Sequence, residues 1–192
     1  MNDPKQMANA LDPRPRIRVG KLDAARRQLE AAIALWFSDG DPVSILTLAF
    51  AAYEVIHVIS KKRDPNRRDL LFDSAIVKDE QRSNFNKWIK ATPNFFKHAN
   101  NDGEAVIEFH PSLAEMFLMF ATLGVELCGE RKNTAEIAYF WYLQITHPSW
   151  ITETGREVLN NTVKIEDLEH LRRRPKSEFF EAFKIARAQH GL

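Results

Sequence analysis

The stretch "DPVSILTLAFAAYEVIHVISKKR", residues 41–63, decides the fold of this chain. Asp41 is a suitable N-cap and Pro42 suits the first helical position, while the cations of 61–63 complement the helix dipole at the other end. Between these ends the residues are apolar on nearly every side of a helix. Because such a helix belongs in the middle of a bundle, the sequence predicts a buried central helix over residues 42–63.

Helical patterns flank this element on both sides. Residues 21–37 repeat apolar side chains at steps of three and four, with Asp23 as the expected N-cap and Gly40 ending the helix. A short helix is expected within 64–77. The remaining patterns predict helices over 78–91, 111–130, 133–147, 150–163 and 177–189.

The predicted fold class is all-α, a multi-helix bundle of about seven or eight helices with short connections. Residues 104–110, "EAVIEFH", alternate enough to predict a short strand. Residues 1–20 are rich in proline and arginine and are expected to form a flexible basic arm. Residues 21–150 would form the bundle, and residues 151–192 would add C-terminal helices that pack on the bundle or extend from it.

The composition narrows the function classes. The chain has 192 residues, 44% of them hydrophobic, and its 27 basic and 26 acidic residues give a formal net charge of +1. A near-neutral total argues against a dedicated nucleic-acid coat protein but allows a local basic patch. No Gly-rich phosphate loop, Gly-x-Ser-x-Gly elbow or His-Glu-x-x-His motif is present, so dinucleotide enzymes, serine hydrolases and zincins are not expected.

The chain is expected to be soluble and cytoplasmic. Its single cysteine, Cys128, rules out an intramolecular disulfide and suits a reducing compartment, and its place in an apolar helix predicts a buried thiol. Residues 1–20 lack the apolar core of a secretory signal. The central helix is interrupted by Thr47, Glu54 and His57, so no membrane span is expected.

A metal site is one possible source of function. Glu54 and His57 are spaced i, i+3 on the central helix and face the same way, as in helical di-iron bundles. His110, with Glu108 and Glu115, could complete the ligand set for a divalent metal ion. The alternative is that Glu54 and His57 line a polar seam. No cofactor is expected other than this metal.

Basic clusters are a second source of function, because closely spaced cations neutralise phosphates. The alternative is that these cations complement helix ends and keep the surface solvated. The clusters are Arg14, Arg16 and Arg18; Lys61, Lys62, Arg63, Arg67 and Arg68; and Arg172, Arg173, Arg174 and Lys176.

The stretch "NFFKHANND", residues 94–102, is a third candidate. If Pro93 begins a helix, Asn94, Lys97 and His98 share a face. An imidazole kept neutral by the lysine would then act as a base in metal-independent RNA cleavage. The alternative is that these residues cap a helix and form a tight turn.

On this segment and the helical pattern, the chain resembles the HEPN superfamily. The resemblance implies a helical, often dimeric protein that binds or cleaves RNA, with His98 as the catalytic histidine. The usual motif places an arginine four to six positions before that histidine. Here the nearest upstream arginine is Arg82, so only His98 carries over. Residues 22–150 also resemble bacterial proteins of no assigned activity.

Three function classes follow from the sequence. The first is an HEPN-like module with RNA as partner, acting as a homo-oligomer. The second is a metal-binding bundle. The third is a non-catalytic interaction protein that uses the aromatic stretch "AYFWYLQITHPSW", residues 138–150, as an oligomer surface, with some of these aromatics in the core.

Overall fold

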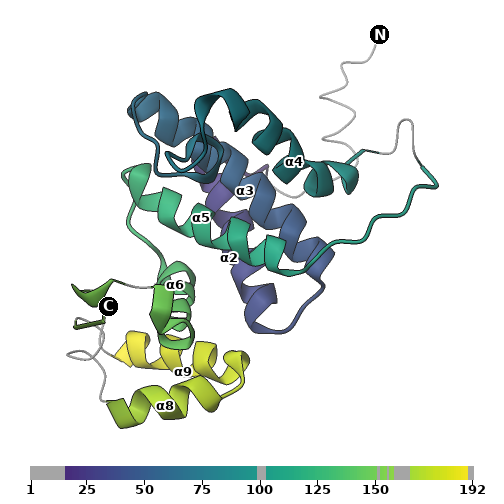
Figure 1. Ribbon diagram of the computed structural model, residues 1–192. Coiled ribbons are helices and arrows are strands. Elements are labelled where there is room, and N and C mark those ends of the chain that lie inside the picture. Colours follow the sequence, from purple (N-terminus) through teal and green to yellow (C-terminus); the bar gives the residue numbers. More distant parts are fainter. Residues whose placement is uncertain (1–15, 99–102, 151, 155, 158–164, 190–192) are drawn as a thin grey trace.

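The computed structural model shows an all-α bundle, which confirms the predicted fold class (Figure 1). Within the residues that it describes, seven α-helices have defined bounds and no strand occurs. The described residues are 16–98, 103–150, 152–154, 156–157 and 165–189.

The α-helices are α2 (Lys21–Phe37), α3 (Pro42–Arg63), α4 (Arg82–Phe95), α5 (Ser112–Leu127), α6 (Thr134–Thr146), α8 (Ile165–Arg173) and α9 (Lys176–Gln189). Three short 3₁₀ turns connect them: η1 (Leu71–Asp73), η2 (Asp79–Gln81) and η3 (Pro148–Trp150).

Helix α3 is the central helix, as predicted. Its N-cap is Asp41, whose Oδ2 accepts a hydrogen bond from the backbone N–H of Ser44 at 2.8 Å, and Pro42 occupies the first helical position. Helices α2 and α5 pack along it. Where α5 crosses α3, a Cβ on Gly124 would lie 2.4 Å from Ile56 Cγ2, so the close approach of the two helices depends on this glycine.

By length and composition, α3 is also the one helix within the described ranges that could cross a membrane. Its contacts with α2 and α5 are those of a core helix, and the core helix of a soluble protein meets the same test.

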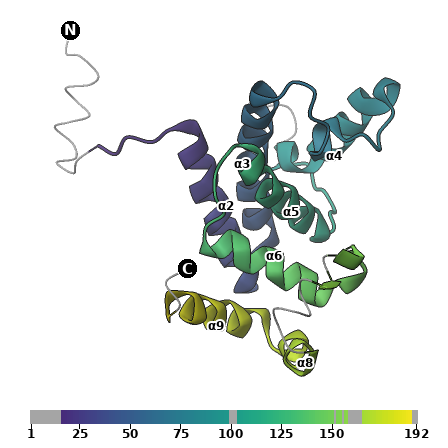
Figure 2. The same ribbon diagram turned by 90° about the vertical axis from the view of Figure 1, so that its left-hand side faces the viewer.

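The other helices surround this centre in two groups (Figures 1 and 2). Helix α4, with η1, covers the face of α3 that α2 and α5 leave open, while α6 contacts both α2 and α5. Helix α9 packs on α6 and α2. The Phe180 ring stacks on Phe37 with centroids 4.4 Å apart and planes 6° from parallel. The described C-terminal helices therefore pack on the bundle.

Several local predictions were wrong. Helix α2 begins at Lys21, after Gly20 as N-cap, so Asp23 lies in its first turn and pairs with Arg27 at 2.9 Å instead of capping. Pro93 lies inside α4, because it is buried near the helix end and only one backbone hydrogen bond is lost there.

Two predictions concern the segments between helices. Residues 104–110 form no strand with any other described part of the chain. The segment 64–77 contains only the 3₁₀ turn η1 in place of a helix. Most of the helix predicted over 150–163 lies outside the described residues.

Candidate functional site: a polar seam and an apolar groove

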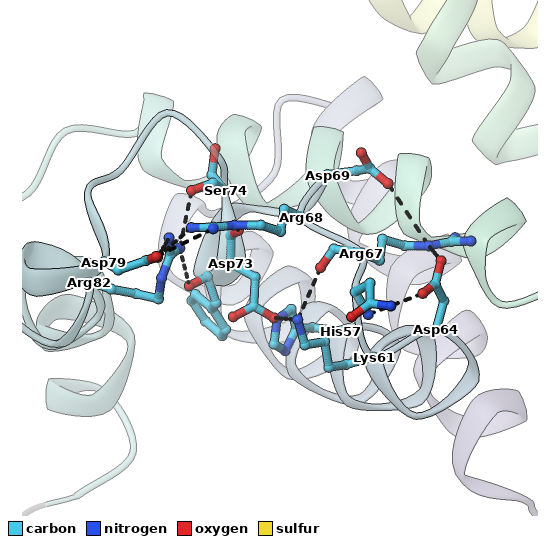
Figure 3. A network of polar contacts seen from close by, with 12 residues as sticks. His57, Lys61, Asp64, Arg67, Arg68, Asp69, Asp73, Ser74, Asp79 and Arg82 are labelled. Carbon is cyan, nitrogen blue, oxygen red and sulfur yellow. Dashed lines mark hydrogen bonds and ion pairs between the residues drawn. The ribbon is translucent and has the colours of Figure 1, made fainter.

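A polar seam follows one face of α3. Glu54, His57 and Lys61 recur at steps of three and four, so their side chains point to the same side of the helix. His57 Nε2 lies 2.9 Å from Asp73 Oδ2. Lys61 Nζ lies 3.4 Å from the same oxygen and donates a hydrogen bond to the Arg67 carbonyl at 3.1 Å (Figure 3). The seam therefore ties the loop after α3 to the central helix.

Burial sets the protonation of the seam histidine. It lowers the pKa of His57, an effect that Asp73 opposes and that Lys90 and Lys61 reinforce. A neutral imidazole in this position donates its Nε2 proton to the Asp73 carboxylate. The cavity beside the pair measures about 10 Å³, which is room for about one water molecule. The pair has the chemistry of a general base but no space for an organic substrate.

Glu54 has different partners from His57. Its carboxylate pairs with Lys90 of α4 at 3.6 Å and with Lys97 at 3.5 Å. The two ammonium groups also lie 4.1 Å from the centroids of the Phe72 and Phe50 rings, respectively. Glu54 thus links α4 to α3 through ion pairs, and cation–π contacts with the two rings stabilise both lysine ammonium groups.

The predicted metal ligands Glu54, His57 and His110 do not come together. His110 lies at the start of α5, where its Nδ1 contacts the Ser112 hydroxyl at 2.8 Å. Glu115 accepts a hydrogen bond from Trp36 Nε1 at 3.2 Å, while Glu108 is exposed. In the part of the chain that the structure describes, no three His, Cys, Asp or Glu side chains form a group that could hold a metal ion.

The basic cluster 61–68 is largely neutralised within the chain (Figure 3). Arg67 pairs with Asp64 at 3.5 Å, and Arg68 pairs with Asp79. Arg82 joins Asp79 at 2.7 Å and donates to the carbonyls of Phe72, Ser74 and Val77 at 3.4, 3.1 and 2.8 Å. Lys62 and Arg63, by contrast, are exposed at the end of α3. Most of this cluster therefore holds a loop in place.

The C-terminal basic cluster has similar internal partners. Arg172 Nε donates to the Ile145 carbonyl at 2.6 Å, Arg173 pairs with Glu169 at 3.8 Å, and Arg174 Nε donates to His170 Nε2 at 2.9 Å. Lys176 Nζ pairs with Asp39 at 2.8 Å. In the N-terminal cluster, Arg16 and Arg18 are exposed ahead of α2, and Arg14 lies outside the described residues.

The stretch around His98 is arranged differently from the prediction. Helix α4 ends at Phe95, so Lys97 and His98 lie beyond it and share no helical face with Asn94. The Lys97 ammonium is engaged by Glu54, whereas Asn94 and His98 are exposed. A turn at Phe96 and Lys97 follows the helix, and the tight turn predicted at 99–102 lies outside the described residues. A role for His98 in RNA cleavage stays a prediction.

The sequence reasoning missed an apolar groove over the outward face of α5, which we call the α5 groove. One hollow, of about 350 Å³, lies between α4 and the start of α5, and a second, of about 200 Å³, continues toward α6 and η3. Ser112 and Met116 line both. The other lining residues are Trp88, Ile89, Thr92, Phe109, His110 and Leu113 in the first hollow and Glu115, Met119, Tyr139, Leu143 and Trp150 in the second.

Helix α5 explains why this groove is apolar. Its buried face supplies Phe117, Leu118 and Ala121 to the core, yet its outward face also carries large apolar side chains, among them Leu113, Met116 and Met119. The signal was present in the sequence as a helix with hardly any polar face. Trp88, 69% exposed, lines the first hollow, and Trp150, 63% exposed, lines the second.

Cys128 follows this helix and is buried, as predicted. Its thiol approaches the Ile56 carbonyl at 3.4 Å, and burial raises its pKa. The thiol is therefore a packed core group and not a nucleophile.

Comparisons with protein-family models, with curated proteins and with solved structures find no match for this chain. The resemblance to the HEPN superfamily therefore stays a prediction from the sequence. Functional inference depends on the chain's own geometry.

Proposed function

We propose that this chain is a non-catalytic interaction protein that holds an amphipathic helix of a protein partner in the α5 groove. The observation that supports this proposal is the pair of adjoining apolar hollows between α4 and η3, which share Met116 and carry the exposed Trp88 and Trp150. Tryptophan side chains that line an apolar groove are typical anchors of protein interfaces.

The shape and chemistry of the groove favour a helix as its occupant. The groove floor is one face of α5, where Leu113, Met116 and Met119 project at helical spacing. Such a ridge accepts the apolar ridge of a second helix. Unbranched methionine side chains adapt to different apolar surfaces. Polar atoms of Ser112 and Glu115 lie between the apolar groups and would orient the bound segment.

Catalysis has weaker support from the same geometry. The His57–Asp73 pair adjoins a cavity that holds about one water molecule. An RNA partner draws support from the exposed Lys62, Arg63 and His98. It draws less from Arg67 and the other cations that have acceptors inside the chain. We place the proposed interaction in the cytoplasm, where Cys128 would stay reduced.

The proposal is tested with a library of amphipathic helical peptides selected for binding to the purified chain. We expect selected peptides to share apolar residues at i, i+3 or i+4, and i+7. Trp88→Ala and Trp150→Ala should each weaken their binding by at least about tenfold in a titration, because each removes a large aromatic contact.

Val58→Ala and Ile76→Ala are matched controls, because both side chains are exposed, at 51% and 91%, and neither lines the α5 groove. They should leave the affinity unchanged. If the library yields no binder, or if the control substitutions weaken binding as much as the tryptophan substitutions do, the groove is not the interaction site.

A further inference from the structure

The connector between α4 and α5 presents an open backbone. After the turn at Gly103–Glu104, residues 105–110 run outside the bundle before α5 begins (Figure 1). No backbone hydrogen bond joins 104–109 to another described segment. Val106 is 92% exposed, and the composition, Val-Ile-Glu-Phe, favours a strand. The segment therefore has strand character but no strand beside it in the described chain.

We propose that two copies of this chain form a dimer by pairing residues 104–110 as a two-stranded antiparallel ladder. Exposed backbone N–H and C=O groups in a strand-like segment are a template for pairing with another strand. A symmetric dimer requires a surface that is complementary to itself. The sequence of this segment meets that requirement in one register.

The register is centred on Ile107, which faces Ile107 of the second copy across the twofold axis. Ala105 then faces Phe109 on the same side of the ladder, since side chains alternate along a strand. On the other side, Val106 faces Glu108 and Glu104 faces His110. By symmetry each of these three pairs occurs twice, whereas the Ile107 pair lies on the twofold axis and occurs once.

The Glu104–His110 pair supplies hydrogen-bond complementarity at both ends of the ladder. In each chain the His110 Nδ1 accepts the Ser112 backbone N–H at 3.2 Å. The imidazole proton therefore lies on Nε2, which can donate to the Glu104 carboxylate of the second copy. His110, which positions the start of α5, thus also has a hydrogen-bond donor for the second copy.

This pairing depends on backbone groups and not on the α5 groove, so it stands apart from the proposed function. Phe109 and His110 nevertheless line that groove as well. A dimer of this kind would carry two grooves next to the shared ladder. A bivalent partner would then bind both.

The mass of the protein in solution is the first test, measured by light scattering over a concentration series. The wild type should be a dimer. The double variant Val106→Pro/Ile107→Pro should dissociate at least about tenfold more readily, because neighbouring residues alternate between bonded and non-bonded pairs and one proline must remove ladder bonds. Val106→Thr/Ile107→Thr is the matched control, since it retains the backbone donors and should weaken the dimer less.

Cross-linking tests the register independently of dimer strength. In Ile107→Cys the two introduced thiols would lie directly opposite each other, and mild oxidation should give a disulfide-linked dimer. Ala105→Cys lies on the same side but faces Phe109, so it should cross-link far more slowly. The wild type, with only the buried Cys128, should give no covalent dimer.

Three results would overturn the proposal. They are a wild type that is monomeric throughout the series, a dimer that the proline variant leaves unchanged, and equal cross-linking of Ile107→Cys and Ala105→Cys. In each variant, an unchanged far-ultraviolet circular dichroism spectrum establishes that the helices are intact.

Discussion

The two sides of α3 differ in how much of their contact is polar. Toward α2 and α5, the contacts are apolar and close, with Leu46, Phe50 and Ile56 fully buried and Gly124 letting α5 approach. Toward α4 and η1, ion pairs and hydrogen bonds cover the polar seam, and their members remain partly exposed. Apolar burial stabilises the fold on both sides, because Phe72 of η1 and Ile89 of α4 are also buried. The polar contacts that the second side adds mainly fix where a loop lies.

This difference predicts how each side responds to change. A steric change on the apolar side should lower the free energy of unfolding of the whole chain, since a packed core transmits strain. A change on the polar side should act locally and should depend on salt and pH, because exposed charges are screened and buried ones titrate.

The largest effect is expected for Gly124→Ala. The added Cβ would lie 2.4 Å from Ile56 Cγ2, so the helices must separate, at a cost of about 1–3 kcal/mol in the free energy of unfolding. Helix propensity alone would favour alanine by about 1 kcal/mol, so a loss of stability identifies the clash. Chemical denaturation measures the change.

Two further variants isolate the cause. Gly20→Ala meets no atom within 4 Å and should cost less than Gly124→Ala, because it changes only the N-cap of α2. Gly124→Ala should cost less in a chain that also carries Ile56→Ala, which removes the clashing methyl group. An equal cost in both backgrounds would mean that α3 and α5 are not in the contact described.

A smaller effect is expected for Arg82→Met on the polar side. The substitution removes the donors to the Phe72, Ser74 and Val77 carbonyls and the pair with Asp79. Water can replace part of this hydrogen bonding. We expect a loss of about 1 kcal/mol. Hydrogen exchange should speed up most in residues 70–81, because that segment loses its attachment.

Arg27→Met is the matched control for Arg82→Met. Arg27 pairs with Asp23 on the exposed surface of α2, and such a pair contributes only about 0.3–0.5 kcal/mol. If exchange in residues 70–81 is as slow in Arg82→Met as in this control, the arginine does not hold the loop.

The smallest effect is a pH dependence carried by His57. Its folded pKa lies below the ordinary value of 6.5, so the unfolded chain binds a proton more readily. The free energy of unfolding should therefore be highest above pH 6.5 and fall on acidification toward the folded pKa. The slope is at most about 1.4 kcal/mol per pH unit for one proton.

Comparison with His57→Gln isolates this contribution, because the buried Glu136 and the other carboxyl groups titrate in both chains. The wild-type free energy minus that of the variant should fall below pH 6.5 and stay level above it. A difference that grew on acidification would show that a protonated His57 paired with Asp73 outweighs the burial of the imidazole.

The sequence was sufficient to predict the elements whose ends carry their own signals. Asp41 and Pro42 begin α3, and Asn133 begins α6 with a capping box in which the Glu136 side chain accepts the Asn133 N–H at 2.7 Å. These caps act through neighbouring residues, so a local pattern contains the whole interaction. Pro93 misled the prediction because burial against the bundle outweighed the local tendency to begin a new helix.

The candidate site was less predictable because its parts are distant in the sequence. Glu54 and His57 were recognised as a possible seam. Their partners Lys90 and Asp73 depend on the path of a loop that has no periodic pattern. The α5 groove depends on which face of an almost wholly apolar helix the other helices leave open. Neither the path of the loop nor the open face of α5 can be predicted from the spacing of residues within one helix.

The stacking of Phe180 on Phe37 has a consequence for biosynthesis. Phe37 ends α2, which leaves the ribosome early, whereas α9 is made only after the rest of the bundle. Until α9 arrives, the aromatic surface at Phe37 and Trp36 stays open to chaperones and proteases. Protection of this part of α2 thus waits for the synthesis of α9, and a product that ended before α9 would keep the aromatic surface exposed.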